Sequence, residues 1–572
     1  MKRSFIFPLA ALFLIIACQS TKKVNVSRNY NAFEYKVEKK SVSQKGAVVS
    51  AHALASKVGV DILKMGGNAV DAAIATQLAL AVVYPGAGNI GGGGFMVARL
   101  TDGKSLTLDY REKAPEKAGR DMYLDEKGNP RMTLSQEGHL AAGVPGTIAG
   151  LFAAHEYANL PFSTLIQPAI ELAEKGFAIN ASEAEGLNEN KNDFLRLNTR
   201  PTAFVHDTKW KEGDTLIQTE LAATLKRISR MGKNGFYKGK TARFIVAEMK
   251  RGRGIISKKD LRSYTAQWRD PMEFDYKGHT ILTMPLPSSG GVLLPQMMKM
   301  VEERSLGAMG LHSVAAVQLM TEVERRAYAD RAKYLGDPDY YKVPVKTLIS
   351  REYLQERMKD FSPDKAGNST LTKAGQAAES EETTHLSVYD GYGNAVAVTT
   401  TLNGGYGSKT VVGGAGFLLN NEMDDFSVKP GVPNMYGAIG AEANAIVPGK
   451  RMLSSMSPTI VLKEGKPYLI TGTPGGTTII TSVFQTLVNM LEFGLDANDA
   501  VNKPKFHHQW FPDVIFVEKD FPASSREQLE KMGYKITIRG QIGRTELIQV
   551  ASDGKVIAVA DKRGDDHAEG YE

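Results

Sequence analysis

Hydrophobic and polar positions follow two different periods along the chain, which predicts a mixed α/β protein. Apolar residues recur at helical spacing over residues 51–64 and 69–83, and many of them are alanine. A longer helix is predicted over 313–334, and the whole stretch 140–335 has a mainly helical pattern. Helices rich in small residues pack closely against a flat surface, so we expect them to cover a sheet.

Shorter stretches rich in β-branched and aromatic residues predict strands, and four of them pair into two hairpins. The predicted strands are 95–100, 105–110, 383–389, 395–401, 459–462 and 468–471, and a helix is predicted over 477–491. The first hairpin turns at a Thr-Asp-Gly-Lys sequence, and the second turns at residues 390–394. Antiparallel hairpins covered by helices are therefore the expected architecture.

Two segments lack the large apolar side chains that a core requires. Residues 18–45 are mainly polar, and we expect them to form a tether in front of the folded part. Residues 362–382 carry a single large apolar side chain, Leu371, and are expected to form a mobile, exposed linker. A strand pattern begins abruptly at Thr383, so this linker divides the chain into a large part and a small part. The two parts are residues 46–382 and 383–572.

Residues 1–17 have the pattern of a secretory signal peptide. Two basic residues precede an apolar run of 13 residues, which is shorter than the ~20 residues needed to span a bilayer. The run ends in Ile-Ile-Ala-Cys, which resembles a bacterial lipobox, and Cys18 is the only cysteine of the chain. We therefore expect a lipidated Cys18 and an exported protein, anchored to a bacterial membrane in the periplasm or at the cell surface. The alternative is an ordinary signal peptide followed by a chance cysteine.

Composition places the chain among globular proteins. Hydrophobic residues make up 42% and charged residues 23% of the 572 residues, which excludes a disordered chain, a coiled coil and a multi-span membrane protein. The net charge of +7 is small for this length and no dense Lys/Arg tract is present, so no nucleic-acid partner is expected. One cysteine excludes an intrachain disulfide and a cysteine-type zinc site. Phosphate-loop, zincin-helix and Gly-x-Ser-x-Gly patterns are also missing, so we expect no metal.

Thr383 is the first residue with a candidate chemical role. A threonine hydroxyl is a weak nucleophile unless a base takes its proton, and a threonine at a chain N-terminus carries that base as its own α-amine. Thr383 would gain a free amine only by cleavage of the Glu382–Thr383 bond, which its position between a polar segment and a strand permits. Threonine is also common at the start of a strand, so the position alone does not establish this role.

Several segments around Thr383 and upstream of it resemble those of the γ-glutamyltranspeptidase family. They are Thr383-Thr384-His385, Gly393-Asn394-Ala395-Val396-Ala397-Val398, Thr401-Leu402-Asn403, 420–426 (Asn-Asn-Glu-Met-Asp-Asp-Phe), 453–459 (Leu-Ser-Ser-Met-Ser-Pro-Thr), 472–476 (Gly-Thr-Pro-Gly-Gly) and Asp109-Tyr110-Arg111-Glu112. Their order and spacing match the family over nearly the whole mature chain. The resemblance implies an α/β protein with the four-layer αββα fold of N-terminal-nucleophile hydrolases. It also implies one precursor that cuts itself into two subunits, which form a heterodimer.

The resemblance further implies a set of catalytic residues. Thr383 would attack the γ-carbonyl of a γ-glutamyl group and form an acyl-enzyme, and Thr401, at the far end of the same predicted hairpin, would hydrogen-bond it. Gly475 and Gly476 would present backbone N–H groups to the oxyanion at a helix start, although an ordinary Pro-Gly turn would have the same sequence. Thr384 is the alternative nucleophile, with the cut one residue later.

The donor is expected to be a zwitterion, so its site needs both signs of charge. The donor-binding residues that the resemblance implies are Arg111, Ser454, Ser455, Asn403, Glu422 and Asp425. The arginine and the two serines would hold the α-carboxylate, and the two acids with the asparagine would hold the α-ammonium. Tyr436 lies in a Pro- and Gly-rich stretch, 430–441, that resembles the lid loop of many members. Without the resemblance, the acids would be interpreted as a solvated turn and Arg111 as part of a surface ion pair.

The expected function is transfer or hydrolysis of γ-glutamyl groups from glutathione and related amides. Water as the acceptor gives glutamate, and an amino acid or peptide as the acceptor gives transpeptidation. Neither reaction needs a metal or organic cofactor. Two alternatives stay open. One is another acylase of the same fold, acting on a β-lactam side chain or on poly-γ-glutamate, and the other is a non-catalytic surface lipoprotein.

Overall fold

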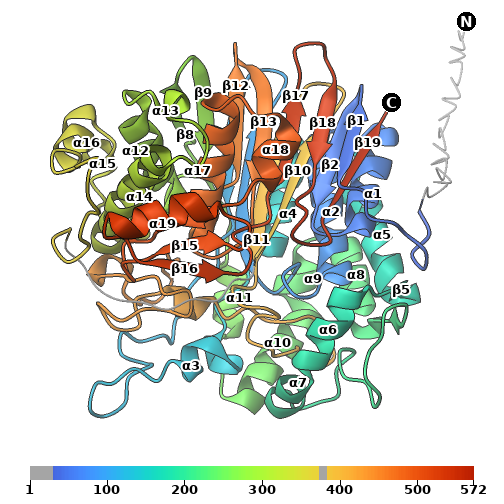
Figure 1. The fold of residues 1–572 in the computed structure, drawn as a ribbon. Coiled ribbons are helices and arrows are strands. Elements are labelled where there is room, and N and C mark those ends of the chain that lie inside the picture. Colours follow the sequence, from blue (N-terminus) through green and yellow to red (C-terminus); the bar gives the residue numbers. More distant parts are fainter. Residues whose placement is uncertain (1–29, 373–382) are drawn as a thin grey trace, which may run out of the picture.

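Two seven-stranded antiparallel sheets form the centre of the computed structural model, which describes residues 30–372 and 383–572 (Figure 1). The predicted signal peptide, Cys18 and Glu382 lie outside the described residues. The first sheet has the order β19 (His567–Tyr571), β2 (Gly46–Ser50), β10 (Thr384–Tyr389), β11 (Ala395–Thr401), β3 (Gly93–Arg99), β4 (Ser105–Asp109) and β7 (Gln267–Arg269). The second has the order β1 (Lys40–Ser43), β18 (Val556–Val559), β17 (Glu546–Val550), β13 (Lys466–Gly472), β12 (Thr459–Lys463), β9 (His279–Thr283) and β8 (Met272–Tyr276).

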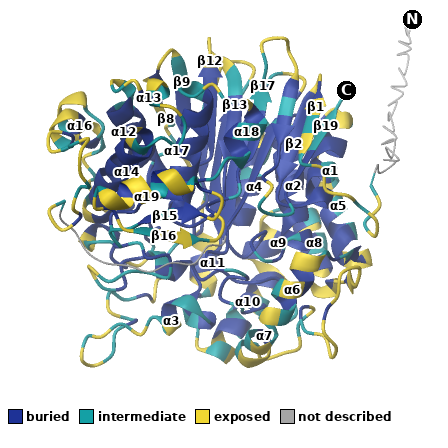
Figure 2. Ribbon diagram, viewed as in Figure 1, coloured by how far each residue is buried: buried dark blue, intermediate teal, exposed yellow. Residues whose placement is uncertain are grey.

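Apolar side chains on both faces of each sheet produce four layers. Between the sheets, Val97 and Ala397 of the first sheet share one buried cluster with Ile460 and Ile548 of the second. Side chains alternate between the two faces of a strand, so the remaining apolar residues of each sheet face outward and are covered by helices (Figures 1 and 2). This order of layers confirms the expected αββα fold.

Helices of different parts of the chain cover the two sheets. On the first sheet lie α1 (Ala53–Lys64) and α2 (Ala69–Val83), with α5 (Phe162–Lys175) and α8 (Thr219–Met231) packed behind them. On the second lie α12 (Gly290–Glu302) and α17 (Thr478–Leu491), with α14 (Val314–Tyr334) packed on α12. All 15 residues of α2 are buried, because the sheet, α1 and α5 surround this helix (Figure 2).

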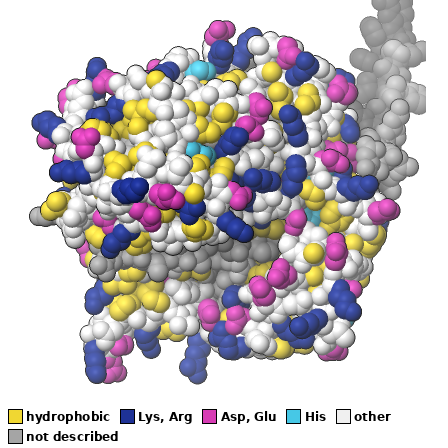
Figure 3. All heavy atoms as spheres, viewed as in Figure 1, with side chains coloured by type: hydrophobic (Ala, Val, Ile, Leu, Met, Phe, Trp, Pro, Cys, Tyr) yellow, Lys and Arg dark blue, Asp and Glu magenta, His cyan; other side chains and the backbone are white. Residues whose placement is uncertain are grey.

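Smaller elements complete the described part of the chain. They include α4 (Thr147–Ala154), α6 (Ala181–Glu189), α7 (Lys191–Leu197), α10 (Gly239–Gly252), α11 (Lys258–Ser263), α16 (Arg351–Arg357), α18 (Ala497–Asn502), α19 (Ala523–Lys531), β14 (Phe506–His507), β15 (Ile515–Glu518) and β16 (Ile536–Arg539). No helix among residues 30–372 and 383–572 is both long enough and apolar enough to cross a membrane. On the face shown in Figure 3, acidic and basic side chains are interspersed, in keeping with the small net charge.

The first sheet combines strands from both sides of Thr383. Strands β10 and β11 pair as a hairpin, with Thr384 opposite Thr400, and they lie between β2 and β3 of the large part. The two predicted hairpins and the predicted helices over 51–64, 69–83 and 313–334 are confirmed. A cut before Thr383 would therefore leave two chains that are held together by backbone hydrogen bonds within one sheet.

The stretch 140–335 is not helical throughout, because β7, β8 and β9 occupy residues 267–283. Strand β8 forms an edge of the second sheet, and its second and fourth residues are exposed while the third and fifth are buried. A short edge strand with half of its side chains in water carries few apolar residues, so its strand signal is weak beside the surrounding helical pattern.

The expected tether is also shorter than residues 18–45. Strand β1 pairs with β18 at the edge of the second sheet, so the fold begins before Gly46. Next to β1, Lys39 Nζ donates hydrogen bonds of 2.6 to 2.9 Å to the backbone carbonyl oxygens of Asp561, Gly564 and Asp566. Polar contacts to a distant part of the chain thus hold a segment whose composition alone indicates no fold.

The expected linker is not exposed over its whole length. Ser369 is buried, its backbone N–H donates to Asp513 Oδ2 at 2.8 Å, and its carbonyl oxygen accepts from Trp510 Nε1 at 3.1 Å. Its hydroxyl contacts Arg325. Hydrogen bonds rather than apolar side chains hold these residues, so a prediction from hydrophobicity misses them. Residues 373–382 of the expected linker lie outside the described residues.

Candidate active site

Thr383 lies directly before β10 and opposite the end of β11. Its hydroxyl donates to the Thr401 hydroxyl, and the two oxygens are 3.5 Å apart. The Thr401 hydroxyl also accepts a hydrogen bond from the Asn403 backbone N–H at 2.7 Å, which fixes its position. The hairpin register sets this arrangement, because Thr384 pairs with Thr400 one step inward. The structure thus brings Thr383 and Thr401 together as the sequence predicts.

The two glycines beside Thr383 lie in the loop between β13 and α17. Gly475 has a φ of +135° and Gly476 a φ of +54°, and both angles favour glycine because a side chain would be strained there. The Thr478 N–H donates to the Gly475 carbonyl oxygen at 2.9 Å, and α17 begins at Thr478. Gly476 borders a cavity at Thr383, and Gly475 borders a second cavity. This strand-to-helix loop therefore separates two cavities at the candidate nucleophile.

A cavity, which we call the donor cavity, opens at Thr383. The residues that line it are Arg111, Arg331, Thr383, Thr401, Asn403, Asp425, Asn434, Tyr436, Ala438, Ser454, Ser455, Met456, Gly476, Thr477 and Ile479. Among them are all the predicted catalytic and donor-binding residues except Gly475 and Glu422. The wall is polar and carries both signs of charge, as a zwitterionic donor requires.

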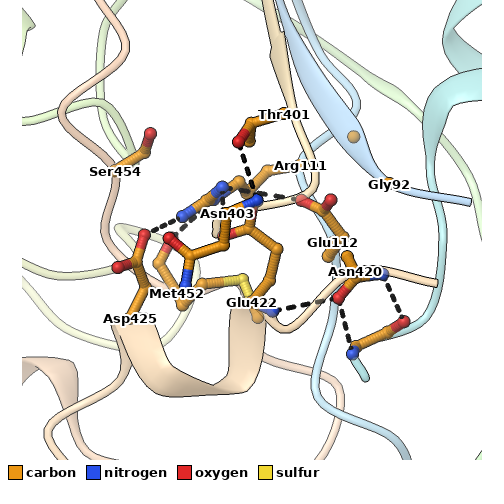
Figure 4. A network of polar contacts seen from close by, with 12 residues as sticks. Gly92, Arg111, Glu112, Thr401, Asn403, Asn420, Glu422, Asp425, Met452 and Ser454 are labelled. Atoms are coloured by element: carbon orange, nitrogen blue, oxygen red, sulfur yellow. Dashed lines mark hydrogen bonds and ion pairs between the residues drawn. The ribbon is translucent and has the colours of Figure 1, made fainter. Parts of the chain in front are cut away.

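Arg111 follows β4 and is almost completely buried, with 1% of its surface exposed. Its Nη1 is 2.6 Å from Glu422 Oε2 and 3.6 Å from Glu112 Oε2, and its Nη2 contacts the Asp425 carboxylate (Figure 4). Burial raises the pKa of Glu112 and of Glu422, and Arg111 only partly counters this effect. Arg111 therefore lies among three carboxyl groups whose charged forms burial disfavours.

Glu422 does not line the donor cavity, contrary to the expectation that it would reach the α-ammonium. Its carboxylate is fully buried against Arg111. Asp425, three residues later in the same 3₁₀ turn, lines the cavity and accepts a hydrogen bond from Asn434 Nδ2 at 2.8 Å. Residues three apart in such a turn share a face, so both acids reach Arg111, but only Asp425 also borders the cavity.

The stretch 430–441 folds over the donor cavity, which is the position expected of a lid. Tyr436 is buried, borders the cavity, and donates its hydroxyl to the Asn403 carbonyl oxygen. The Tyr436 N–H in turn donates to Asn434 Oδ1 at 3.0 Å. The first bond joins the lid to Asn403, whose backbone N–H also positions Thr401.

Arg331 is a cavity residue that the sequence analysis does not identify. It lies in α14, where Nε donates to Ser289 Oγ at 3.1 Å and Nη2 donates to Ser455 Oγ at 3.3 Å. Within the described residues it forms no ion pair. Burial lowers the pKa of Arg331, although Tyr328 and Asp425 oppose this effect. Helix α14 carries charged residues on several sides and nearly all are buried, so its periodicity does not single out the residue at the cavity.

The arrangement is suited to acyl transfer through a hydroxyl nucleophile. A threonine oxygen, a second hydroxyl, a glycine loop and a cavity with both signs of charge lie within one small region. Over residues 30–372 and 383–572, no group of three or more His, Cys, Asp or Glu side chains is placed to hold a metal ion.

Comparisons with known proteins agree with this geometry. The model of the Gamma-glutamyltranspeptidase family matches residues 55–571. The chain is 46% identical over 535 residues to the "Glutathione hydrolase proenzyme" of Escherichia coli (strain K12), covering 92% of both chains. It is 47% identical over 528 residues to the protein of the same name from Pseudomonas aeruginosa, covering 91% of this chain and 93% of that one. The crystal structure of cephalosporin acylase from Bacillus halodurans superimposes with a TM-score of 0.81 at 26% identity, over 94% of this chain and 98% of that one.

The family match includes every residue of the candidate site, from Arg111 to Gly476, and the relatives are aligned over almost their whole length. Sequence, fold and site therefore agree, and the chain belongs to the γ-glutamyltranspeptidase family.

Proposed function

We propose that this chain is a γ-glutamyltransferase and glutathione hydrolase whose nucleophile is Thr383. The observation that carries the proposal is the position of Thr383, which lies beside Thr401 and borders a cavity with both signs of charge. Relatives that are called glutathione hydrolase proenzyme and share 46% and 47% identity support the same substrate and a processed precursor.

Maturation is the first reaction of Thr383 in this proposal. Its hydroxyl attacks the carbonyl carbon of Glu382, the peptide bond shifts to an ester, and water hydrolyses that ester. The products are a large subunit that ends at Glu382 and a small subunit that begins with the free α-amine of Thr383. Because β10 and β11 lie between β2 and β3, the small subunit stays paired with the large subunit after the cut.

Catalysis uses the same oxygen with the new amine as its base. The α-amine accepts the hydroxyl proton while the oxygen attacks the γ-carbonyl carbon of the donor. Backbone N–H groups of Gly475 and Gly476 stabilise the oxyanion, and one such donor is worth about 2.7–4 kcal/mol. The C–N bond then breaks, the leaving amine takes the proton, and the γ-glutamyl group stays on Thr383 as an ester. Water or an acceptor amine releases it.

The charges of the donor cavity favour a donor with a free α-amino acid end. Asp425 and Asn403 suit the α-ammonium, whereas Arg111, Ser454 and Ser455 suit the α-carboxylate. The related cephalosporin acylase makes a β-lactam side-chain acylase the second candidate. Parallel assays of glutathione and a glutaryl amide distinguish the two, because the glutaryl group has no α-ammonium for Asp425 to bind. Faster turnover of the glutaryl amide would contradict the proposal.

A gel and N-terminal sequencing test the nucleophile directly. The wild-type protein should yield two bands, and the small subunit should begin Thr-Thr-His-Leu. Thr383→Ala should stay a single band and lack activity, because alanine has no oxygen for either reaction. Thr384→Ala is the matched control: the Thr384 hydroxyl is buried and makes no hydrogen bond to other described residues, so its loss should leave processing intact. A small subunit that begins Thr-His-Leu would assign the reaction to Thr384 instead.

We also propose that Cys18 carries a lipid that anchors the protein to a bacterial membrane, in the periplasm or at the cell surface. The support is the Ile-Ile-Ala-Cys sequence after an apolar run and the absence of any other cysteine. The wild-type protein should partition into the detergent phase, and Cys18→Ser should move to the aqueous phase with unchanged glutathione hydrolysis. Ser20→Ala, two residues later, should partition like the wild type. Equal partitioning of the wild type and Cys18→Ser would rule out the anchor.

A further inference from the structure

Thr383 borders a second cavity besides the donor cavity. This second cavity is lined by Tyr84, Thr383, Pro474, Gly475, Gln541, Gly543 and Arg544. The two adjacent glycines of the β13–α17 loop face different cavities, Gly476 the donor cavity and Gly475 the second one. A carbonyl group attacked by Thr383 and held at this loop would have its γ-glutamyl side in the donor cavity. Its other substituent, the amine side, would extend into the second cavity.

Arg544 supplies the positive charge of the second cavity. Its backbone N–H donates to Thr473 Oγ1 at 2.7 Å, which ties it to the start of the glycine loop. Its guanidinium lies 5.5 Å from the centre of the Tyr84 ring. The side chain extends past Gly564, where an added Cβ would lie 2.7 Å from Arg544 Cδ. The absence of a side chain at position 564 therefore makes room for the arginine.

The Arg544 side chain borders the second cavity and is 13% exposed. Its Nη2 lies 3.2 Å from Asp566 Oδ1, its single ion pair within the described residues. Its Nε and Nη2 are buried and make no hydrogen bond to other described residues, so a ligand in the cavity would contact the remaining nitrogen, Nη1. Burial opposes the charge, but Asp566, Tyr84 and Glu546 raise the pKa of Arg544 well above its usual value, so it stays cationic. Burial also raises the pKa of Glu546 well above its usual value.

We propose that the second cavity binds the amine partner of the reaction and that Arg544 recognises its carboxylate. The inference rests on the proposed function. The ligand class is an amino acid or short peptide with a free α-carboxylate, which enters as the acceptor or departs as the leaving group. For glutathione, the departing dipeptide ends in such a carboxylate, and Arg544 can pair with it through a charge-assisted hydrogen bond.

The chemistry in the second cavity is the same in both directions. In transfer, the neutral amine nitrogen of the acceptor attacks the ester carbonyl carbon on Thr383. A C–N bond forms, the bond from that carbon to Thr383 Oγ1 breaks, and its electron pair stays on the oxygen. The α-amine of Thr383 carries the proton from the acceptor nitrogen to the oxygen. With glutathione as the donor, these steps run in reverse and the dipeptide departs through the second cavity.

Acceptor pairs that differ only in the carboxylate test this proposal. With a γ-glutamyl anilide as the donor, glycylglycine and glycylglycinamide are compared as acceptors for the wild type, Arg544→Gln and Arg544→Lys. The wild type should prefer the acid over the amide at least tenfold in kcat/KM. Arg544→Gln should reduce this preference to within about twofold, and Arg544→Lys should keep part of it. Lys555→Gln removes one positive charge from a surface turn that borders neither cavity, and it should retain the full preference.

Each outcome supports or overturns the assignment. An acid-over-amide preference that survives in Arg544→Gln, or that is missing in the wild type, overturns it. Equal losses for both acceptors in Arg544→Gln would also overturn it, because they indicate damage to Thr383 or the loop. If Arg544→Gln does not mature, the acid-over-amide preference is compared between the wild type and Arg544→Lys, which should keep only part of it. Anilide hydrolysis without acceptor reports on the donor cavity alone, so its absence in the wild type would identify a failure of the proposed function itself.

Discussion

Replacement of Arg331 with glutamine should weaken donor binding without destabilising the protein. The buried Arg331 guanidinium bonds to Ser289 Oγ and Ser455 Oγ but forms no ion pair within the described residues. A buried cation that has two hydroxyl acceptors but no ion pair is unfavourable, so a cation kept in this state indicates an anionic ligand. The α-carboxylate of a γ-glutamyl donor held at Ser455 would lie next to this charge.

The size of the effect follows from the bonds involved. A hydrogen bond to a charged group is worth about 1.5–3 kcal/mol, and each 1.4 kcal/mol is about a factor of ten in affinity. Arg331→Gln should therefore raise KM for a γ-glutamyl anilide by about 10- to 150-fold. Arg331→Lys keeps the charge and should lose less. A 4-aminobutyryl anilide, which has no α-carboxylate, should react equally well with the wild type and Arg331→Gln.

Arg111 provides the contrast in stability. Its guanidinium lies 2.6 Å from Glu422 and contacts Asp425, and removal of one partner from a buried ion pair costs about 3–5 kcal/mol. Arg111→Gln should thus lower the melting temperature, whereas Arg331→Gln should leave it unchanged or raise it. Both are best measured in the uncleaved Thr383→Ala background, where a single chain unfolds. A melting temperature that falls equally in both variants, with an unchanged KM in Arg331→Gln, would contradict a role for Arg331 in donor binding.

Three further perturbations test other parts of the structure. Burial raises the pKa of Glu248, but hydrogen bonds from His139, Arg251 and the Gly413 N–H outweigh it and lower the pKa to about 2. The Glu248 carboxylate therefore stabilises the fold by about 3 kcal/mol above the unfolded pKa of ~4.5, and this stabilisation disappears as the pH falls toward 2. Glu248→Gln should reduce the loss of melting temperature between pH 6 and pH 3. The same dependence of melting temperature on pH in the variant and the wild type would contradict this. Tyr436→Phe removes the hydrogen bond to the Asn403 carbonyl oxygen, and a loss of about 1 kcal/mol should raise the donor KM about fivefold in steady-state assays. Gly476→Ala places a Cβ 2.6 Å from Tyr436 Cδ1 at a φ of +54°, so kcat/KM should fall at least tenfold. Gly465→Ala is the control, because Gly465 has a φ of +77° and no atom within 4 Å of an added Cβ, and it should leave kcat/KM unchanged.

Local patterns in the sequence predict the elements that carry the nucleophile. The hairpin over 383–401 follows from strand composition and a short turn, and its register alone places Thr401 beside Thr383. Helix α17 and the glycines before it are equally local, since positive φ angles and a strand-to-helix change leave a signal within a few residues. These features depend on neighbours in the chain, which is why the sequence contains them.

Long-range polar contacts explain what the sequence does not predict. Arg111 and Glu422 are 311 positions apart, and no period shows that the acid lies behind the arginine rather than on the cavity wall. Arg331 is one of many charged residues in α14, and only the fold determines which of them reaches the cavity. The positions of Lys39 and Ser369 likewise depend on hydrogen bonds to residues far away in the chain.

The position of Thr383 explains how maturation and catalysis can share one residue. In the precursor its nitrogen belongs to an amide and cannot accept a proton, so the oxygen has no base for the donor reaction. The proposed cut would create that base at the boundary of the two cavities, within a sheet whose strands would come from both subunits. A cut at any other bond would leave Thr383 without its amine. Under the proposed function, activity therefore depends on cleavage at this one position, and a donor that fits the cavity of the uncleaved chain should still not be turned over.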